Sequence, residues 1–147
     1  MATTLTKTTQ EFMTAFNSHD LEKLLSLYTN DAAYEDVGLG VVYHGLQEIR
    51  KNLNDFFKSF PDVKMEFTSD FRSGDWGASE WVMTGTNKGN MPAIGGMPEI
   101  PATNKKISLK GATILQFRNN KVSREADYWD MATFARQLGL MPAQPGK

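Results

Sequence analysis

The feature that most constrains this chain is a change in the spacing of its apolar residues after Pro61. Before Pro61, apolar residues recur every three or four positions, which predicts amphipathic helices over 3–19, 21–28 and 46–60. After Pro61 they alternate with polar residues, which is the period of a half-buried antiparallel strand. Both periods in one chain favour an α+β domain with its helices on one face of a sheet.

The remaining elements follow from turn residues and alternation. Four long strands are expected at 63–72, 76–86, 106–118 and 121–130. A short strand over 31–37 is followed by a predicted loop over 38–45, and a short helix over 131–138 closes the domain. The segment 88–105 is rich in proline and glycine and is the expected lid. Helices packed on such a curved sheet would enclose a cone-shaped pocket.

Length and composition narrow the possible functions. The 147 residues suit one domain spanning 1–147. Sixteen basic and 17 acidic side chains give a net charge of −1 with no basic run, so we expect neither a nucleic acid nor a membrane surface as partner. With no cysteine and two histidines, no disulfide and no metal site are expected. Nothing resembles a leader or a membrane span, so the predicted location is cytoplasmic.

Short motifs along the chain point to one family. They are HGLQEIR at 44–50, FPD at 60–62, GD at 74–75, TGT at 84–86, WD at 129–130 and RQLG at 136–139. In this order and spacing they resemble the SnoaL-like polyketide (ester) cyclases of the NTF2-like superfamily. The resemblance covers residues 10–142, nearly the whole chain.

The resemblance implies a fold and a chemistry. The fold is a cone-shaped α+β barrel with three N-terminal helices on a strongly curved, mostly antiparallel sheet, usually a homodimer packed through the sheet. The ligand is a hydrophobic small molecule in an apolar cavity, and no cofactor or metal is needed. In the characterised cyclases an aspartate near the end of the last strand acts as general acid and base in an intramolecular aldol reaction. Asp130 matches that position.

Asp130 has two interpretations. It could be a general base whose pKa is raised by an apolar pocket, or the N-cap of the helix over 131–138. Asp127 lies on the opposite face of the same strand by the period of two, so only one of the two aspartates can point into the cavity. We expect Asp127 to be solvated.

A second candidate carboxylate is Asp36. The segment YEDVG at 34–38 resembles the aspartate motif of the ketosteroid isomerases, another branch of the superfamily. Those enzymes pair their base with a tyrosine and a protonated aspartic acid, whereas this chain has Phe12 and Thr113 at the matching positions. The alternative for Asp36 is a loop residue in an Asx-turn before Gly38.

The expected substrate-binding residues are mostly large and apolar. They are Phe12, Phe16, Tyr34, Trp81, Met83, Thr113, Gln116 and Tyr128. Thr113 is the polar member of an apolar strand face, and Gln116 resembles a polar position of the cyclases on the same strand. The alternative for the aromatic residues is ordinary core packing.

These observations lead to one leading function and two alternatives. The leading hypothesis is a cofactor-independent enzyme that acts on a hydrophobic, carbonyl-containing small molecule by aspartate acid/base catalysis. The first alternative is a non-catalytic ligand-binding or dimerisation protein, since the fold does not determine function. The second is an isomerase or hydrolase relative that uses Asp36. An open cavity with a carboxylate at its base would favour an enzyme.

Overall fold

The computed structural model describes residues 4–143 and 145. Their helices are α1 (Lys7–Asn17), α2 (Leu21–Ser26), α3 (Gly45–Ser59) and α4 (Met131–Gln137). Their strands are β1 (Tyr28–Asp36), β2 (Val41–His44), β3 (Lys64–Ser73), β4 (Trp76–Thr86), β5 (Lys106–Arg118) and β6 (Lys121–Trp129). The outermost parts of the predicted domain, residues 1–3, 144 and 146–147, lie outside the described residues.

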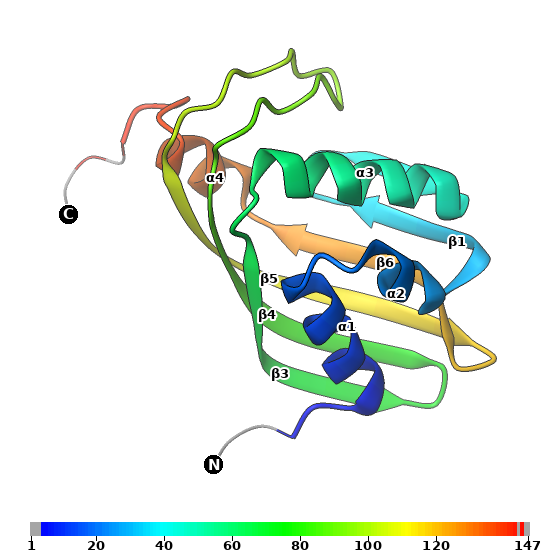
Figure 1. Cartoon of the computed structure of the whole chain (residues 1–147). Helices are drawn as coiled ribbons and strands as arrows, with labels where there is room; N and C mark the ends of the chain where they lie inside the picture. The colour runs from blue at the N-terminus through cyan, green and yellow to red at the C-terminus, as the bar shows by residue number, and fades with distance from the viewer. Residues whose placement is uncertain (1–3, 144, 146–147) are drawn as a thin grey trace.

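The six strands form one sheet in the order β2-β1-β6-β5-β4-β3. Neighbouring strands are antiparallel except β1 and β6, which run parallel. Figure 1 shows that the sheet is curved and that α1, α2 and α3 lie on its concave side. The predicted α+β architecture with a mostly antiparallel curved sheet is confirmed.

The helices pack through stripes of apolar side chains. In α3, Ile49, Leu53 and Phe57 recur every four residues and are buried, which places them on one face of the helix. They join a core that also contains Trp81 and Leu109 from the sheet. This packing holds α3 against the concave face of the sheet, next to the cavity described below.

One predicted loop contains a strand. The segment 38–45 was expected to be irregular, but Val41–His44 form β2, which pairs with β1 and places Tyr43 directly opposite Tyr34. The prediction was wrong because four residues are too few to show a period of two. The strands at 76–86 and 106–118 are confirmed, and the other elements agree to within four residues at their ends.

The segment 88–105 forms a long connection between β4 and β5, at the top of Figure 1. Its only pairing among the described residues is two isolated bridges, Met91 to Ile100 and Ile94 to Met97. Buried Asn87 joins the two ends of this connection, because its side-chain oxygen accepts a hydrogen bond from the Thr103 backbone N–H at 2.8 Å. The connection is therefore irregular but anchored.

None of the helices in residues 4–143 is long and apolar enough to cross a membrane.

Candidate active site

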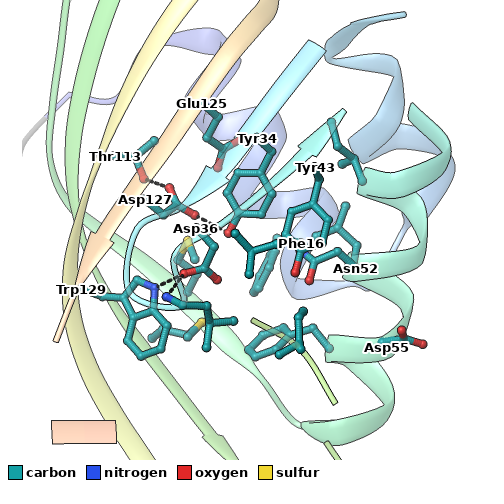
Figure 2. Close-up of a pocket in the computed structure, with 18 of the residues that line it drawn as sticks. Phe16, Tyr34, Asp36, Tyr43, Asn52, Asp55, Thr113, Glu125, Asp127 and Trp129 are labelled. Carbon is teal, nitrogen blue, oxygen red and sulfur yellow. Dashed lines mark hydrogen bonds between the residues drawn. The ribbon is translucent and has the colours of Figure 1, made fainter. Parts of the chain in front are cut away.

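A cavity of about 540 Å³ lies between the concave face of the sheet, the helices α1 and α3, and the 88–105 connection. This volume is in the range of small-molecule sites. Most of its lining is apolar, and six of the eight predicted binding residues take part: Phe12, Phe16, Tyr34, Trp81, Met83 and Thr113. Its polar groups lie on two sides: α3 contributes residues such as Asn52 and Asp55, and β1 and β6 contribute three buried or half-buried acids, Asp36, Glu125 and Asp127 (Figure 2).

The strand register explains why these acids meet. Asp36 pairs with Asp127 across the parallel β1–β6 ladder, and Asp127 pairs with Thr113 across β6–β5. Residues paired in this way project from the same face of a sheet. Glu125 is two residues from Asp127 and so shares its face. The sheet therefore holds three carboxyl groups on its concave side.

Asp36 lies at the end of β1 and is buried, with 8% of its surface exposed. Its Oδ1 accepts a hydrogen bond from Trp129 Nε1 at 2.7 Å and another from the Leu39 backbone N–H at 3.0 Å (Figure 2). Burial raises the pKa of Asp36, and these hydrogen bonds counteract part of that shift. The bond from Leu39, three residues after Asp36, spans one residue more than the Asx-turn expected as the alternative. Asp36 therefore holds the loop that follows β1 and also lines the cavity.

Asp127 is held by hydroxyl groups at both oxygens. Thr113 Oγ1 donates to Oδ1 at 2.6 Å, and the Tyr34 hydroxyl donates to Oδ2 at 3.0 Å. The indole N–H of Trp81 donates in turn to Thr113 Oγ1 at 2.8 Å. Burial raises the pKa of Asp127 to about 6 despite these donors. This carboxyl group therefore changes charge close to neutral pH.

Glu125 is the most deeply placed of the three acids, with 6% of its surface exposed. The Tyr28 hydroxyl donates a hydrogen bond to its Oε2. Burial, followed by the negative charge of Asp127, raises the pKa of Glu125 well above its usual range. Glu125 therefore binds its proton more tightly than Asp127 does.

Asp130 lies elsewhere. Asp130 is the N-cap of α4, the second of its two interpretations. Its Oδ1 accepts a hydrogen bond from the Ala132 backbone N–H at 3.1 Å, and its Oδ2 accepts one from Thr133 Oγ1 at 2.6 Å. Its side chain is 65% exposed, and it is not part of the cavity lining. These hydrogen bonds, that from Thr133 foremost, lower its pKa. Its catalytic role stays a prediction that this placement does not favour.

The expectation for Asp127 was wrong. Only one of Asp127 and Asp130 lines the cavity, as expected, but it is Asp127. β6 ends at Trp129, so Asp130 already belongs to the start of α4 and follows helix geometry.

Two predicted binding residues also lie outside the cavity. Tyr128 alternates with the inward Asp127 and Trp129 and is 47% exposed on the outer face of the sheet. Gln116 pairs with Trp76 and Arg124, away from the row that contains Thr113. Both corrections follow from strand alternation.

Tyr43, Glu125 and Trp129 are among the cavity residues that sequence reasoning missed. Tyr43 was assigned to a loop. Trp129 was noticed as part of the WD motif but given no role, although its indole N–H contacts Asp36. The alternation that places Thr113 inward could have identified Glu125 and Trp129 if the pairing of β5 with β6 had been known.

The cavity residues are suited to proton chemistry. Within the part of the chain that the structure describes, no group of three or more His, Cys, Asp or Glu residues is arranged to hold a metal ion. The inward acids instead contact hydroxyl and indole groups in apolar surroundings. Buried carboxyl groups with raised pKa values are typical of general acids and bases.

Comparisons with known proteins agree with this fold. A protein with a ketosteroid isomerase-like fold from Catenulispora acidiphila DSM 44928, solved with trimethylamine, is 22% identical and superposes with a TM-score of 0.77 over 98% of this chain and 100% of that one. AclR, a candidate hydroxylase from Streptomyces galilaeus, is 22% identical, with a TM-score of 0.76 over 94% and 86%. A candidate SnoaL-like polyketide cyclase from Jannaschia sp. CCS1 is 13% identical, with a TM-score of 0.79 over 92% of each chain. No curated protein matches the chain significantly.

The helices on a curved sheet, with the cavity on the concave side, give the chain a ketosteroid isomerase-like fold. The family model of the SnoaL-like polyketide cyclases matches residues 7–138. The chain belongs to this family, as its motifs predict.

Proposed function

We propose that this protein is a cofactor-independent enzyme that moves a proton on a hydrophobic, carbonyl-containing small molecule, with Asp36 as the general base. The observation that carries the proposal is a buried aspartate at the wall of an apolar cavity of about 540 Å³. Apolar surroundings raise the proton affinity of a carboxylate and so make it a stronger base. This proposal takes the Asp36 alternative over Asp130.

The hydrogen bonds favour Asp36 over Asp127 as the base. Both oxygens of Asp127 accept hydrogen bonds from side chains, at 2.6 and 3.0 Å. The donors at 2.7 and 3.0 Å from Asp36 both contact Oδ1. We therefore assign proton transfer to Oδ2 of Asp36. Asp127 then serves to hold Tyr34 in place.

The proposed reaction is an intramolecular aldol addition of the cyclase type. Asp36 removes a proton from a carbon between two carbonyl groups, and the electron pair of the C–H bond passes into the adjoining carbonyl to form an enolate. The enolate carbon then bonds to a further carbonyl carbon of the same molecule. The oxygen of that carbonyl takes up the proton held by Asp36, which returns the carboxylate to its starting state.

The 88–105 connection supports an apolar substrate. Met91, Ile94 and Met97 from this connection line the cavity. Flexible thioether side chains adapt to ligands of varied shape, and an apolar cover keeps water from an enolate. We propose that the connection acts as the lid.

The test is hydrogen exchange on 2-methyl-1-phenylbutane-1,3-dione in D₂O, in which NMR follows loss of the proton at C2. The unaltered protein should accelerate exchange above the buffer rate. Asp36→Asn should lower the protein-catalysed rate about 100-fold or more. Asp36→Glu, which keeps a carboxyl group in the turn, should retain part of the rate. Full exchange in Asp36→Asn would refute the assignment, and binding of the diketone without exchange would favour the non-catalytic alternative.

We also propose that two copies associate through the outer face of the sheet. Phe71, Trp76 and Tyr128 are exposed large apolar side chains on β3, β4 and β6. Such groups favour an interface. Sedimentation equilibrium should give about twice the chain mass, and Trp76→Glu should shift the population to monomer. A monomer at all concentrations would contradict the proposal. The cytoplasmic location stays a prediction.

A further inference from the structure

Tyr43 is a cavity residue with no role in the proposed reaction so far. It comes from β2, the edge strand, and pairs directly with Tyr34 of β1. The two rings stack with centroids 5.6 Å apart and planes 16° from parallel. Figure 2 shows both tyrosines at the cavity beside Asp36.

The hydroxyl group of Tyr43 differs from those of its neighbours. The Tyr34 hydroxyl donates to Asp127, and the Tyr28 hydroxyl donates to Glu125. Among the residues that the structure describes, the Tyr43 hydroxyl is the buried side-chain polar atom that has no hydrogen-bond partner. A buried hydroxyl without a partner is unfavourable, so a ligand that accepts its hydrogen bond gains affinity from that contact.

The hydroxyl is available as a donor. Burial, followed by the negative charges of Asp36 and Asp55, raises the pKa of Tyr43 to about 12. The group therefore keeps its proton over the whole range in which the protein would work. The carboxyl group of Asp36 adds negative charge to the surroundings of Tyr43, whereas that of Asp55 is paired with Lys51 at 2.7 Å. An ionised Asp36 disfavours an anionic ligand and favours a neutral acceptor.

We propose that the Tyr43 hydroxyl donates a hydrogen bond to a carbonyl oxygen of the substrate, and that the stacked Tyr34–Tyr43 pair selects a flat, unsaturated ring bearing that carbonyl. The inference rests on the proposed function for the identity of the acceptor. It deepens that function, because the oxygen bound by Tyr43 is the atom on which negative charge accumulates when Asp36 removes a proton from the adjacent carbon.

The experiment measures equilibrium binding with no turnover. The probe is 2-acetylnaphthalene labelled with ¹³C at the carbonyl, and the reference is 2-isopropenylnaphthalene, which has the same shape without the carbonyl oxygen. The infrared stretching frequency of the bound carbonyl should be lower than in hexane, as expected for a hydrogen-bonded ketone. In Tyr43→Phe it should return towards the value in hexane.

Affinities give the second measurement. Tyr43→Phe should weaken binding of the ketone about three- to tenfold, as expected for the loss of one neutral hydrogen bond. It should leave binding of the hydrocarbon unchanged, because the phenyl ring still stacks on Tyr34. Tyr128→Phe is the matched control, since it removes a hydroxyl from the outer face of the sheet, and it should change neither ligand.

Three results would overturn the inference. They are a carbonyl frequency in the unaltered protein equal to that in hexane, an equal loss of affinity for ketone and hydrocarbon in Tyr43→Phe, and no binding of the ketone. The first needs no variant, so a folding defect in Tyr43→Phe leaves the inference testable.

The outcome is separable from that of the proposed function. A carbonyl shift that depends on Tyr43, together with full exchange in Asp36→Asn, would support the inference and refute Asp36 as the base. Loss of exchange in Asp36→Asn, together with a carbonyl shift that does not depend on Tyr43, would support Asp36 as the base and refute the inference about Tyr43.

Discussion

The acids on the inner face of β6 have surroundings opposite to those of Glu35 on β1 and of Asp130 at the start of α4. On the inner face, Glu125 and Asp127 contact tyrosine and threonine hydroxyls. On the outer face, Arg124 forms an ion pair with Glu35 at 3.8 Å, and Asp130, just past the strand, lies 4.0 Å from Arg136. In the described ion pairs, no lysine or arginine contacts an inner acid. Burial therefore raises the pKa values of Glu125 and Asp127 inside the cavity. The pKa of Asp130, an exposed carboxyl group, is lowered by its hydrogen bonds.

The comparison teaches that closeness in the sequence does not decide the surroundings of an acid, because β6 directs Asp127 into the cavity and the chain turns into α4 before Asp130. Asp127 and Asp130 are three positions apart, yet one lines a cavity and the other caps a helix. Proton transfer needs a carboxyl group away from water and cations. Only the inner face provides such surroundings along β6.

The largest expected difference between the two sets of acids is in catalysis. Asp36→Asn should lower diketone exchange about 100-fold or more, whereas Asp130→Asn should leave it within about twofold, because asparagine is also a good N-cap. Both rates are measured by NMR under one set of conditions. A larger loss in Asp130→Asn than in Asp36→Asn would reverse the comparison and restore Asp130 as the candidate base.

The second difference is in the dependence of stability on pH. Acids whose pKa is raised in the folded state bind more protons there than in the unfolded chain, so stability falls as pH rises from about 4 through their folded pKa values. Asp127, with a pKa of about 6, by itself predicts a loss of about 1.4 kcal/mol between pH 5 and pH 8, and the raised pKa of Glu125 adds to the loss in the same direction.

Urea unfolding at several pH values measures this loss. Glu125→Gln should flatten the dependence and stabilise the protein at pH 8, because glutamine cannot ionise. Groups with lowered pKa values, such as Asp130, affect stability only below about pH 4. Stability that increases from pH 5 to pH 8 would contradict the raised pKa values inside.

The third prediction concerns the indole that contacts Asp36. The hydrogen bond from Trp129 lowers the pKa of Asp36, so Trp129→Phe should raise it. Because the ionised form is the base, exchange should then be lost at a higher pH as the solution is acidified. The pH–rate profile measures this shift, and Trp76→Phe on the outer face is the matched control. If the pH at which exchange is lost is the same in Trp129→Phe, the titration that abolishes exchange is not that of Asp36.

The smallest expected effect is structural. Asp130→Ala removes the acceptor for the Ala132 backbone N–H and should destabilise the protein by about 1 kcal/mol. Thermal or urea unfolding measures the change, and Asp130→Asn should restore most of the loss. An unaltered exchange rate in folded Asp130→Ala would show that Asp130 contributes to stability and not to proton transfer.

Much of the fold was predictable from local pattern. The strands at 76–86 and 106–118 and the helix stripe of Ile49, Leu53 and Phe57 follow from apolar spacing alone. The strand β2 was not predictable in this way, since it is short and lies at the edge, where pairing with β1 rather than burial defines it.

The site was predictable only in part. Asp36 and Thr113 were identified from motif and alternation, and both line the cavity. The inward position of Asp127 depends on its pairing with Thr113 and Asp36, which lie in other parts of the chain. A single sequence carries no record of such pairing, and a shift of one residue exchanges the two faces of a strand.

The parallel pairing of β1 with β6 has a consequence for how the protein is made. Asp36 and its indole partner Trp129 are separated by 93 positions, and β6 is the last strand to leave the ribosome. Until it does, β1 and β5 lack the strand between them, and the acids cannot gather. Contacts so distant in sequence form late and slowly. A chain cut short before β6 would therefore lack both the reactive cluster and the middle of its sheet, leaving two unpaired edges open to aggregation.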